Sequence, residues 1–138
     1  QQGMPLKKGF HEILRFLHAH HVPMGIATSS MPDIVKTNLE HAQARHYFQT
    51  IVTGYDSDVA HGKPAPDIYQ CARLHTTPAQ CVVVEDSPSG VRAAHAAGAM
   101  TALIPDVAAL SPEERKMARW IVSSLDQLIP ILREEMGL

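Results

Sequence analysis

Cysteine is scarce in this 138-residue sequence, and its spacing excludes the commonest cysteine-based sites. The two cysteines, Cys71 and Cys81, do not form a C-x-x-C pair, so neither a zinc site nor a thioredoxin-like redox motif is expected. Cys71 falls in a predicted helix and Cys81 opens a predicted strand, which favours reduced core thiols, with a disulfide as the minor alternative. Reduced thiols are typical of a cytoplasmic protein.

Long apolar runs and a strong excess of one charge are also absent. No run approaches the roughly 20 residues needed to cross a bilayer, and no signal peptide is recognisable. The formal net charge is −2, which argues against nucleic acid or an anionic membrane as a partner. The chain begins Gln1-Gln2-Gly3, and Met4 comes too late for a natural start. We therefore expect that residues upstream of Gln1 have been removed.

Hydrophobic residues make up 45% of the chain, as in an ordinary globular protein, and the length of 138 residues with no internal linker predicts a single domain over residues 1–138. Helical and strand periods alternate about five times, which predicts a three-layer, doubly wound parallel sheet with helices on both faces, a Rossmann-like fold. Predicted helices cover residues 6–20, 31–45, 66–74, 88–97 and 125–136, with another from 112, and predicted strands cover 22–27, 50–53, 81–84, 100–104 and 120–122.

Several helix ends carry specific signals. Ser30 is predicted to cap the second helix. Ser87 is predicted to cap the helix that follows the third strand, with Pro88 at its first position and Gly98 at its end. Pro130 should kink or divide the last helix, because proline removes a backbone donor from a helix interior.

Two adjacent carboxylates, Glu85 and Asp86, end the most strand-like run of the chain, residues 81–84. Carboxylates at the end of a buried strand are costly to desolvate unless a positive charge lies beside them. Oxygen ligands of this kind suit Mg²⁺, which takes one or two carboxylates and leaves room for a substrate phosphate. On these residues alone, a metal site and a solvated acidic turn are equally favoured.

Polar residues also follow two other predicted strands. Thr28, Ser29 and Ser30 place three hydroxyls at a helix start, which suits an anion, whereas capping alone explains only Ser30. Lys63 lies in a loop between a glycine and a proline, where a lone lysine is usually solvated surface. Ligands of open α/β sheets bind at the carboxyl ends of strands, so these residues are expected to share one site.

Taken together, the three strand ends predict a pocket for phosphate and magnesium. Thr28, and Ser29 beside it, would hydrogen-bond phosphate oxygens. Lys63 would neutralise phosphate charge and keep nearby carboxylates ionised, so Thr28 and Lys63 are the predicted catalytic residues of this chain. Asp86 and Glu85 would hold the metal. Ser87, besides capping its helix, would support Asp86 by a hydrogen bond.

Three segments carry a resemblance to a known family. Residues 26–30, 62–69 and 83–99 resemble, in order and spacing, the second, third and fourth motifs of the haloacid dehalogenase superfamily of phosphatases and phosphomutases. The group that contains β-phosphoglucomutase and pseudouridine-5′-phosphatase is the most similar. The likeness covers essentially the whole chain and implies the core domain of that family.

The family's first motif has no counterpart in the sequence. That motif is a strand ending in D-x-D, whose first aspartate attacks phosphorus and whose second is the general acid and base. The family places it before residue 1, followed by a helical cap that selects the substrate. Asp56, Asp58, Asp67 and Asp106 lie in other contexts. The absent strand would be central, so the strands starting at Val22 and Val82 are expected to have unpaired edges.

The resemblance implies a Mg²⁺-dependent phosphomonoester hydrolase that acts through a phospho-aspartate on a small phosphorylated metabolite, of the sugar phosphate or nucleoside monophosphate type. The chain alone lacks the nucleophile and is expected to be inactive. A sugar-phosphate mutase and a non-catalytic phosphate-binding remnant are the alternatives. A two-component receiver domain is disfavoured, because it places its acids first and its lysine last.

Overall fold

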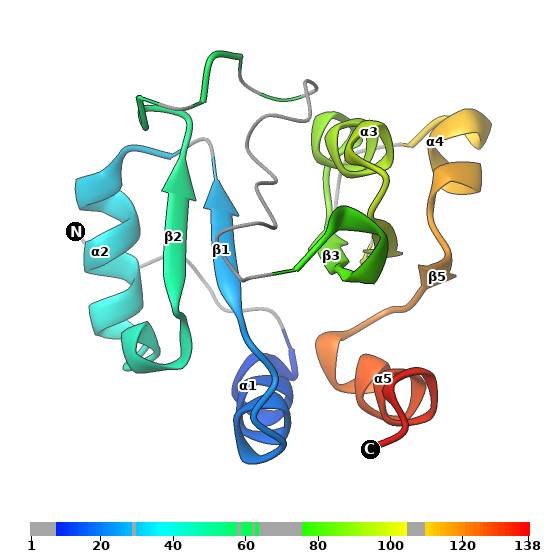
Figure 1. Ribbon diagram of the computed structural model, residues 1–138, viewed down its shortest axis with the longest axis horizontal. Helices are drawn as coiled ribbons and strands as arrows, with labels where there is room; N and C mark the ends of the chain where they lie inside the picture. The colour runs from blue at the N-terminus through cyan, green and yellow to red at the C-terminus, as the bar shows by residue number, and fades with distance from the viewer. Residues whose placement is uncertain (1–7, 29, 58, 62, 64–75, 105–109) are drawn as a thin grey trace.

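The computed structural model describes residues 8–28, 30–57, 59–61, 63, 76–104 and 110–138 (Figure 1). The predicted helix over 66–74, with Cys71, lies outside these residues, as does Ser29. The described helices and strands follow in order: α1 Phe10–Ala19, β1 Gly25–Thr28, α2 Pro32–His41, η1 Arg45–Tyr47, β2 Thr50–Thr53, η4 Pro78–Gln80, β3 Val82–Glu85, α3 Pro88–Ala97, β4 Met100–Leu103, α4 Pro112–Met117, β5 Trp120–Ile121, η5 Leu125–Gln127 and α5 Leu128–Met136.

The strands of the described residues form two parallel sheets rather than one. Strand β1 pairs with β2 in register from Gly25↔Thr50 to Thr28↔Thr53, and β3, β4 and β5 form the second sheet in that order. The prediction of an α/β fold with parallel strands is confirmed. Within the described residues β1 and β3 share no ladder, and β1 is the strand of its sheet on the side toward β3 (Figure 1). The edges of these two strands are therefore unpaired there, as expected.

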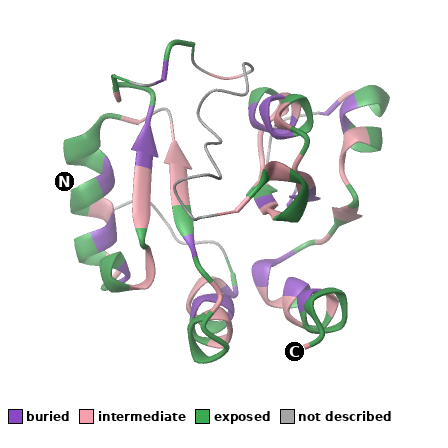
Figure 2. Cartoon of the chain, in the orientation of Figure 1, coloured by how far each residue is buried: buried purple, intermediate pink, exposed green. Residues whose placement is uncertain are grey.

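Helix α1 joins the hydrophobic cores of the two sheets. Ile13 packs in a cluster with Ala102 of β4 and Leu128 of α5, whereas its neighbour Leu14 packs in a second cluster with Val35 of α2. Adjacent helical residues point about 100° apart, so one helix can serve both clusters. Figure 2 shows the buried residues of α2 on its side toward β2. Packing on α1 thus substitutes for direct pairing between the sheets.

Two of the predicted helix ends differ from the structure. The N-cap of α2 is Met31, not Ser30, and no side chain caps it. The division expected at Pro130 falls earlier, because residues 125–127 form η5 and α5 begins at Leu128. Pro130 then lies in the first turn of α5, where a missing backbone donor does no harm. The predicted cap of α3 is confirmed: Ser87 Oγ accepts from the Gly90 N–H at 3.2 Å.

The remaining boundary shifts have backbone causes. Helix α1 begins at Phe10 because Gly9 has a φ of +85°, a conformation that glycine adopts without strain. Strand β1 begins at Gly25 rather than Val22, because the Val22 N–H donates to Leu17 O and closes the end of α1. None of the described helices has both the length and the apolar character that crossing a membrane requires.

Candidate active site

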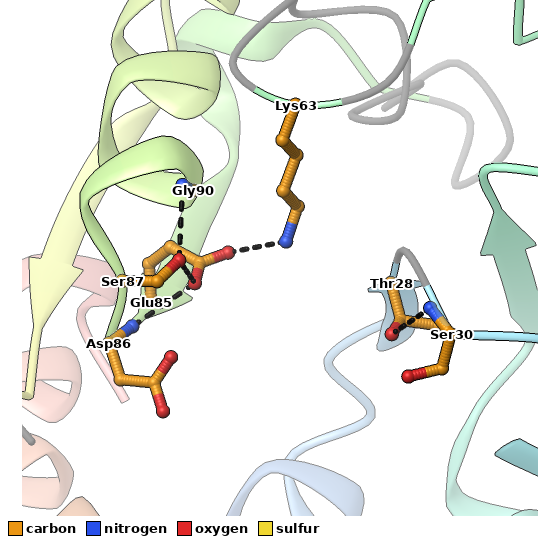
Figure 3. A network of polar contacts seen from close by, with 7 residues as sticks. All are labelled: Thr28, Ser30, Lys63, Glu85, Asp86, Ser87 and Gly90. Atoms are coloured by element: carbon orange, nitrogen blue, oxygen red, sulfur yellow. Dashed lines mark hydrogen bonds and ion pairs between the residues drawn. The ribbon is translucent and has the colours of Figure 1, made fainter.

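An ion pair connects the loop containing Lys63 to the end of β3. Lys63 Nζ lies 2.7 Å from Glu85 Oε2, and the two side chains are only 13% and 9% exposed (Figure 3). A lysine and a carboxylate this close, and this well shielded from water, form a charge-assisted hydrogen bond that holds both side chains in place. The reading of Lys63 as a solvated surface lysine is therefore wrong, and so is the reading of Glu85 as part of a solvated turn.

The Glu85 carboxylate is also held by the start of α3. Its Oε1 accepts from the Asp86 N–H at 3.1 Å and from the Ser87 hydroxyl at 3.2 Å. A Cβ at position 90 would collide with this carboxylate, so only glycine permits the approach. A carboxylate at a helix N-terminus is favoured by the helix dipole and by the exposed backbone donors. Sequence reasoning missed Gly90, and its only signal was a glycine within the first turn of a helix.

Ser87 has a different partner from the predicted one. Its hydroxyl donates to Glu85 and accepts from the Gly90 N–H, so it links the acid pair to the helix. Asp86 lies between Glu85 and Ser87 in the sequence. Figure 3 shows that its carboxylate is turned away from the Lys63–Glu85 pair. The two acids thus have different surroundings: Glu85 faces a lysine, whereas Asp86 points elsewhere.

Thr28 ends β1 and shapes the turn that follows. Its Oγ1 accepts from the Ser30 N–H at 3.1 Å, which fixes the hydroxyl where the chain leaves the sheet. In Figure 3 the Lys63 ammonium projects between the Thr28 side and the Glu85 side. The structure thus gathers Thr28, Lys63, Glu85 and Asp86 in one region at the ends of β1 and β3.

A third carboxylate, that of Asp56, lies beyond the end of β2. Its Oδ1 accepts from Thr53 Oγ1 at 2.9 Å, and its N–H donates to Thr53 O at 3.2 Å. These hydrogen bonds close a local turn after β2. This position agrees with the prediction that Asp56 is not part of the family's first motif, which is a strand ending in D-x-D. Asp58, Asp67 and Asp106 lie outside the described residues.

The groups in the candidate active site that could bind a metal ion are carboxylates, which bind through oxygen. Within the described part of the chain, no group of three or more His, Cys, Asp or Glu side chains is arranged to hold an ion. Glu85 and Asp86 supply two carboxylates, a number that suits Mg²⁺ because this ion usually keeps several waters and takes further oxygens from substrate phosphate. The donor set therefore fits Mg²⁺, with Asp86 as the better placed of the two.

Residues 1–104 match the family model for haloacid dehalogenase-like hydrolases. The chain belongs to this family. The resemblance of its three motifs is thereby confirmed, and so is its assignment to a hydrolase family with named phosphatase members. The separate roles of Thr28, Ser29, Lys63, Glu85, Asp86 and Ser87 remain predictions.

Named relatives of this haloacid dehalogenase-like chain are phosphatases. It is 39% identical over 141 residues to a probable pseudouridine-5′-phosphatase of Drosophila melanogaster, covering 96% of this chain and 58% of the relative. It is 45% identical over 78 residues to a fructose-1-phosphate phosphatase of Escherichia coli, covering 55% of this chain and 40% of the relative. The chain thus spans less than two thirds of the length of these relatives.

Solved structures of the family share the fold. A hydrolase of the family from Deinococcus radiodurans, with bound phosphate and sodium, superposes with a TM-score of 0.82 at 29% identity, over 95% of this chain and 60% of that one. The protein CbbY from Rhodobacter sphaeroides, in complex with phosphate, superposes with a TM-score of 0.77 at 25% identity, over 89% of this chain and 56% of that one. The Rossmann-like prediction is thereby confirmed.

Proposed function

We propose that this chain forms the phosphate- and metal-binding part of a Mg²⁺-dependent phosphomonoester hydrolase. The observation that carries the proposal is the shielded Lys63–Glu85 pair, which holds an ammonium group at the strand ends beside Thr28. A fixed cation next to a hydroxyl is a preorganised site for a dianionic phosphoryl group. The phosphatase names of the relatives support the same reaction class.

Each residue then has a distinct task. Thr28 donates its hydroxyl hydrogen to a phosphate oxygen while its Oγ1 accepts from Ser30. Lys63 neutralises charge on the phosphoryl group and remains anchored by Glu85. Glu85 is then a positioning residue for Lys63 more than a metal ligand. Such positioning matters because a preorganised charge needs no rearrangement when the transition state forms.

Asp86 is the proposed direct ligand of Mg²⁺. When bound, Mg²⁺ supplies charge neutralisation and orientation for the phosphoryl group. Glu85 and the start of α3 fix the backbone on which Asp86 stands, through the bond from the Asp86 N–H to Glu85 Oε1. Asp86 and Lys63 would therefore approach the phosphoryl group from different directions.

The nucleophile of the reaction is proposed to be an aspartate outside these 138 residues. Its carboxylate oxygen would bond to phosphorus as the bond from phosphorus to the ester oxygen breaks, and the second aspartate of the D-x-D strand would give that oxygen a proton. Water, deprotonated by the same second aspartate, would then hydrolyse the acyl phosphate to free phosphate and the original carboxylate. The edges of β1 and β3 that pair with no other described strand support a place for the strand that carries this aspartate, because an added parallel strand there would join the two sheets.

The proposed substrate is a small phosphorylated metabolite of the sugar phosphate or nucleoside monophosphate type. The relatives are named for pseudouridine 5′-phosphate and fructose 1-phosphate, and both compounds join a phosphate to a sugar ring. Thr28, Lys63 and Asp86 would bind only the phosphate end of such a molecule. A cytoplasmic location is proposed only from the low cysteine count and the lack of a C-x-x-C spacing in the sequence.

Steady-state kinetics test the proposal. The 138-residue chain should show negligible hydrolysis of a simple phosphomonoester such as p-nitrophenyl phosphate. A longer form of the protein that includes a D-x-D strand should hydrolyse it, should need Mg²⁺, and should lose activity at least a hundredfold in Lys63→Ala. Robust Mg²⁺-dependent turnover by the short chain, abolished in Asp86→Asn, would overturn the assignment of the nucleophile. Transfer to a second sugar hydroxyl instead of water would identify a mutase.

A further inference from the structure

A surface groove of about 610 Å³ lies where the side of α1 meets the end of α2 and η1. We call it the η1 groove and define it by the charged and aromatic side chains that line it, His11, Arg15, Glu40, Arg45, His46 and Tyr47; Leu39 and Gln43 complete the lining. Its volume falls within the range of roughly 300–1,000 Å³ that is typical of small-molecule sites.

The η1 groove is separate from the candidate active site. Element η1 comes directly before β2, so it lies at the amino end of that strand. Thr28 lies at the carboxyl end of β1, which runs parallel to β2 with Thr28 opposite Thr53. A four-residue strand rises about 10 Å, so the two sites are at opposite ends of the sheet. Nothing in the proposed function uses the groove.

The charge of the lining is mostly of one sign. Arg15 and Arg45 bring two permanent positive charges, and His11 and His46 add imidazoles that can donate hydrogen bonds. Glu40 is the single carboxylate among the lining residues. Arg45 Nη1 donates to Phe48 O at 2.8 Å, which takes one of its five donors and holds the guanidinium in place. An anchored arginine loses less side-chain entropy when it binds an anion.

The same lining includes an aromatic wall. The rings of His46 and Tyr47 pack with centroids 4.1 Å apart and planes tilted by 35°. The ring of His18 meets Tyr47 edge-on, with centroids 5.4 Å apart. Rings fixed by such contacts offer a planar ligand a preformed surface. A groove for simple inorganic anions would need neither this wall nor this volume.

We propose that the η1 groove binds a nucleoside monophosphate, with the phosphate on the arginines and the planar base against the ring pair of His46 and Tyr47. Arginine is the residue best suited to phosphate, because its planar fork can make two parallel hydrogen bonds to phosphate oxygens. Base stacking on aromatic side chains supplies the second contact, and it tolerates any base because every base has a π-face. The ligand would occupy this site in addition to the substrate.

The test is a titration of the chain with adenosine monophosphate, followed by NMR of the Tyr47 and His46 ring resonances. The Lys63→Ala variant is the background, because it removes phosphate binding at the candidate active site. Adenosine and inorganic phosphate, each titrated alone, measure the two halves of the ligand. Arg15→Ala is the test variant, since Arg15 is exposed on α1 and its truncation should leave the fold intact. Arg115→Ala, exposed on α4, is the matched control.

We expect saturable shifts of both rings with adenosine monophosphate, a dissociation constant at least tenfold weaker in Arg15→Ala, and no change in Arg115→Ala. Tyr47→Leu should weaken adenosine monophosphate while leaving inorganic phosphate unchanged. Equal affinity in Arg15→Ala and the background would overturn the proposal. Inorganic phosphate binding as tightly as the nucleotide would also overturn it, because the groove would then be a general anion surface.

Discussion

Lys63 and Glu85 are 22 positions apart in the sequence, yet their charged groups meet at 2.7 Å in a place where each side chain is at most 13% exposed. The pair connects the loop after β2 to the end of β3, and so relates the two sheets at the candidate active site. Both the stability of this region and its affinity for phosphate should depend on that contact.

Breaking the pair from one side should be costly. Lys63→Met leaves the Glu85 carboxylate without its cation, and the loss of one partner from a buried ion pair typically costs about 3–5 kcal/mol. Urea unfolding should show a decrease toward the lower end of that range, because some exposure remains. Lys116→Met, at an exposed position on α4, is the control and should change stability little.

A double variant separates the interaction energy of the Lys63–Glu85 pair from the effects of the two single substitutions. Lys63→Met with Glu85→Gln should recover part of the lost stability, because it removes the uncompensated charge. In phosphate binding, by contrast, the double variant should be no better than Lys63→Met alone. Strictly additive losses of stability would contradict a direct interaction between the two side chains.

Gly90→Ala tests the close approach of Glu85 to α3. Alanine normally favours a helix over glycine by about 1 kcal/mol. At position 90 the new methyl group would collide with the Glu85 carboxylate, so we expect a decrease in the melting temperature and weaker phosphate binding. Ser89→Ala, exposed in the same helical turn, should be nearly neutral. A Gly90→Ala protein that is more stable than the parent and binds phosphate normally would show that the close approach of the Glu85 carboxylate to residue 90 is not required.

Asp86→Asn tests the proposed metal ligand. The amide has the shape of the carboxylate but not its charge, so the affinity for Mg²⁺ should fall at least tenfold while the fold persists. Isothermal titration with MgCl₂ measures this directly. Asp33→Asn, at an exposed position of α2, controls for the loss of one negative charge. The same Mg²⁺ affinity in both variants would remove Asp86 from the site.

Glu114 gives the fold a pH dependence. The Ser111 N–H and the Arg92 guanidinium, which donate to its two carboxylate oxygens at 2.9 and 2.8 Å, hold the pKa of Glu114 below its ordinary value. A lowered pKa in the folded state stabilises the protein at pH values above the unfolded pKa of about 4.3. That contribution is lost as the pH falls through the folded value.

Unfolding at pH 7 and pH 3 measures the contribution of Glu114. Glu114→Gln should be less stable than the parent at pH 7, and the difference should shrink toward pH 3. Glu113→Gln is the matched control, because Glu113 is 81% exposed and lies 3.9 Å from Arg92. A pH-independent difference for Glu114→Gln would contradict the stated role of its charge.

The end of β3 and the start of α3 could be predicted from sequence because their signals are local. Ser87 and Pro88 mark a helix start through capping and through a fixed φ, and the β-branched residues before Glu85 mark a strand. The acid pair at this junction followed from those two elements. That Lys63 lies near the acid pair was predicted from the shared strand ends. Its choice of Glu85 as the direct partner was not, since no local rule relates residues 22 positions apart.

The first residue of α2 and the different roles of Glu85 and Asp86 could not be predicted in the same way. Ser30 fits the cap position by type, but its N–H donates to Thr28 Oγ1 and the helix begins one residue later. Glu85 and Asp86 look equivalent in sequence, and only the fold turns one toward Lys63. Likewise, Ile13 and Leu14 of α1 are similar apolar neighbours in the sequence, whereas the structure packs them in two different cores.

The most direct test of the central claim is isothermal titration of inorganic phosphate into the chain, with and without Mg²⁺, in the parent, Lys63→Met and Asp86→Asn. The proposed site predicts phosphate binding that is lost in Lys63→Met, and that Mg²⁺ strengthens in the parent but not in Asp86→Asn. Phosphate binding that is the same in all three proteins, with no effect of Mg²⁺, would contradict it.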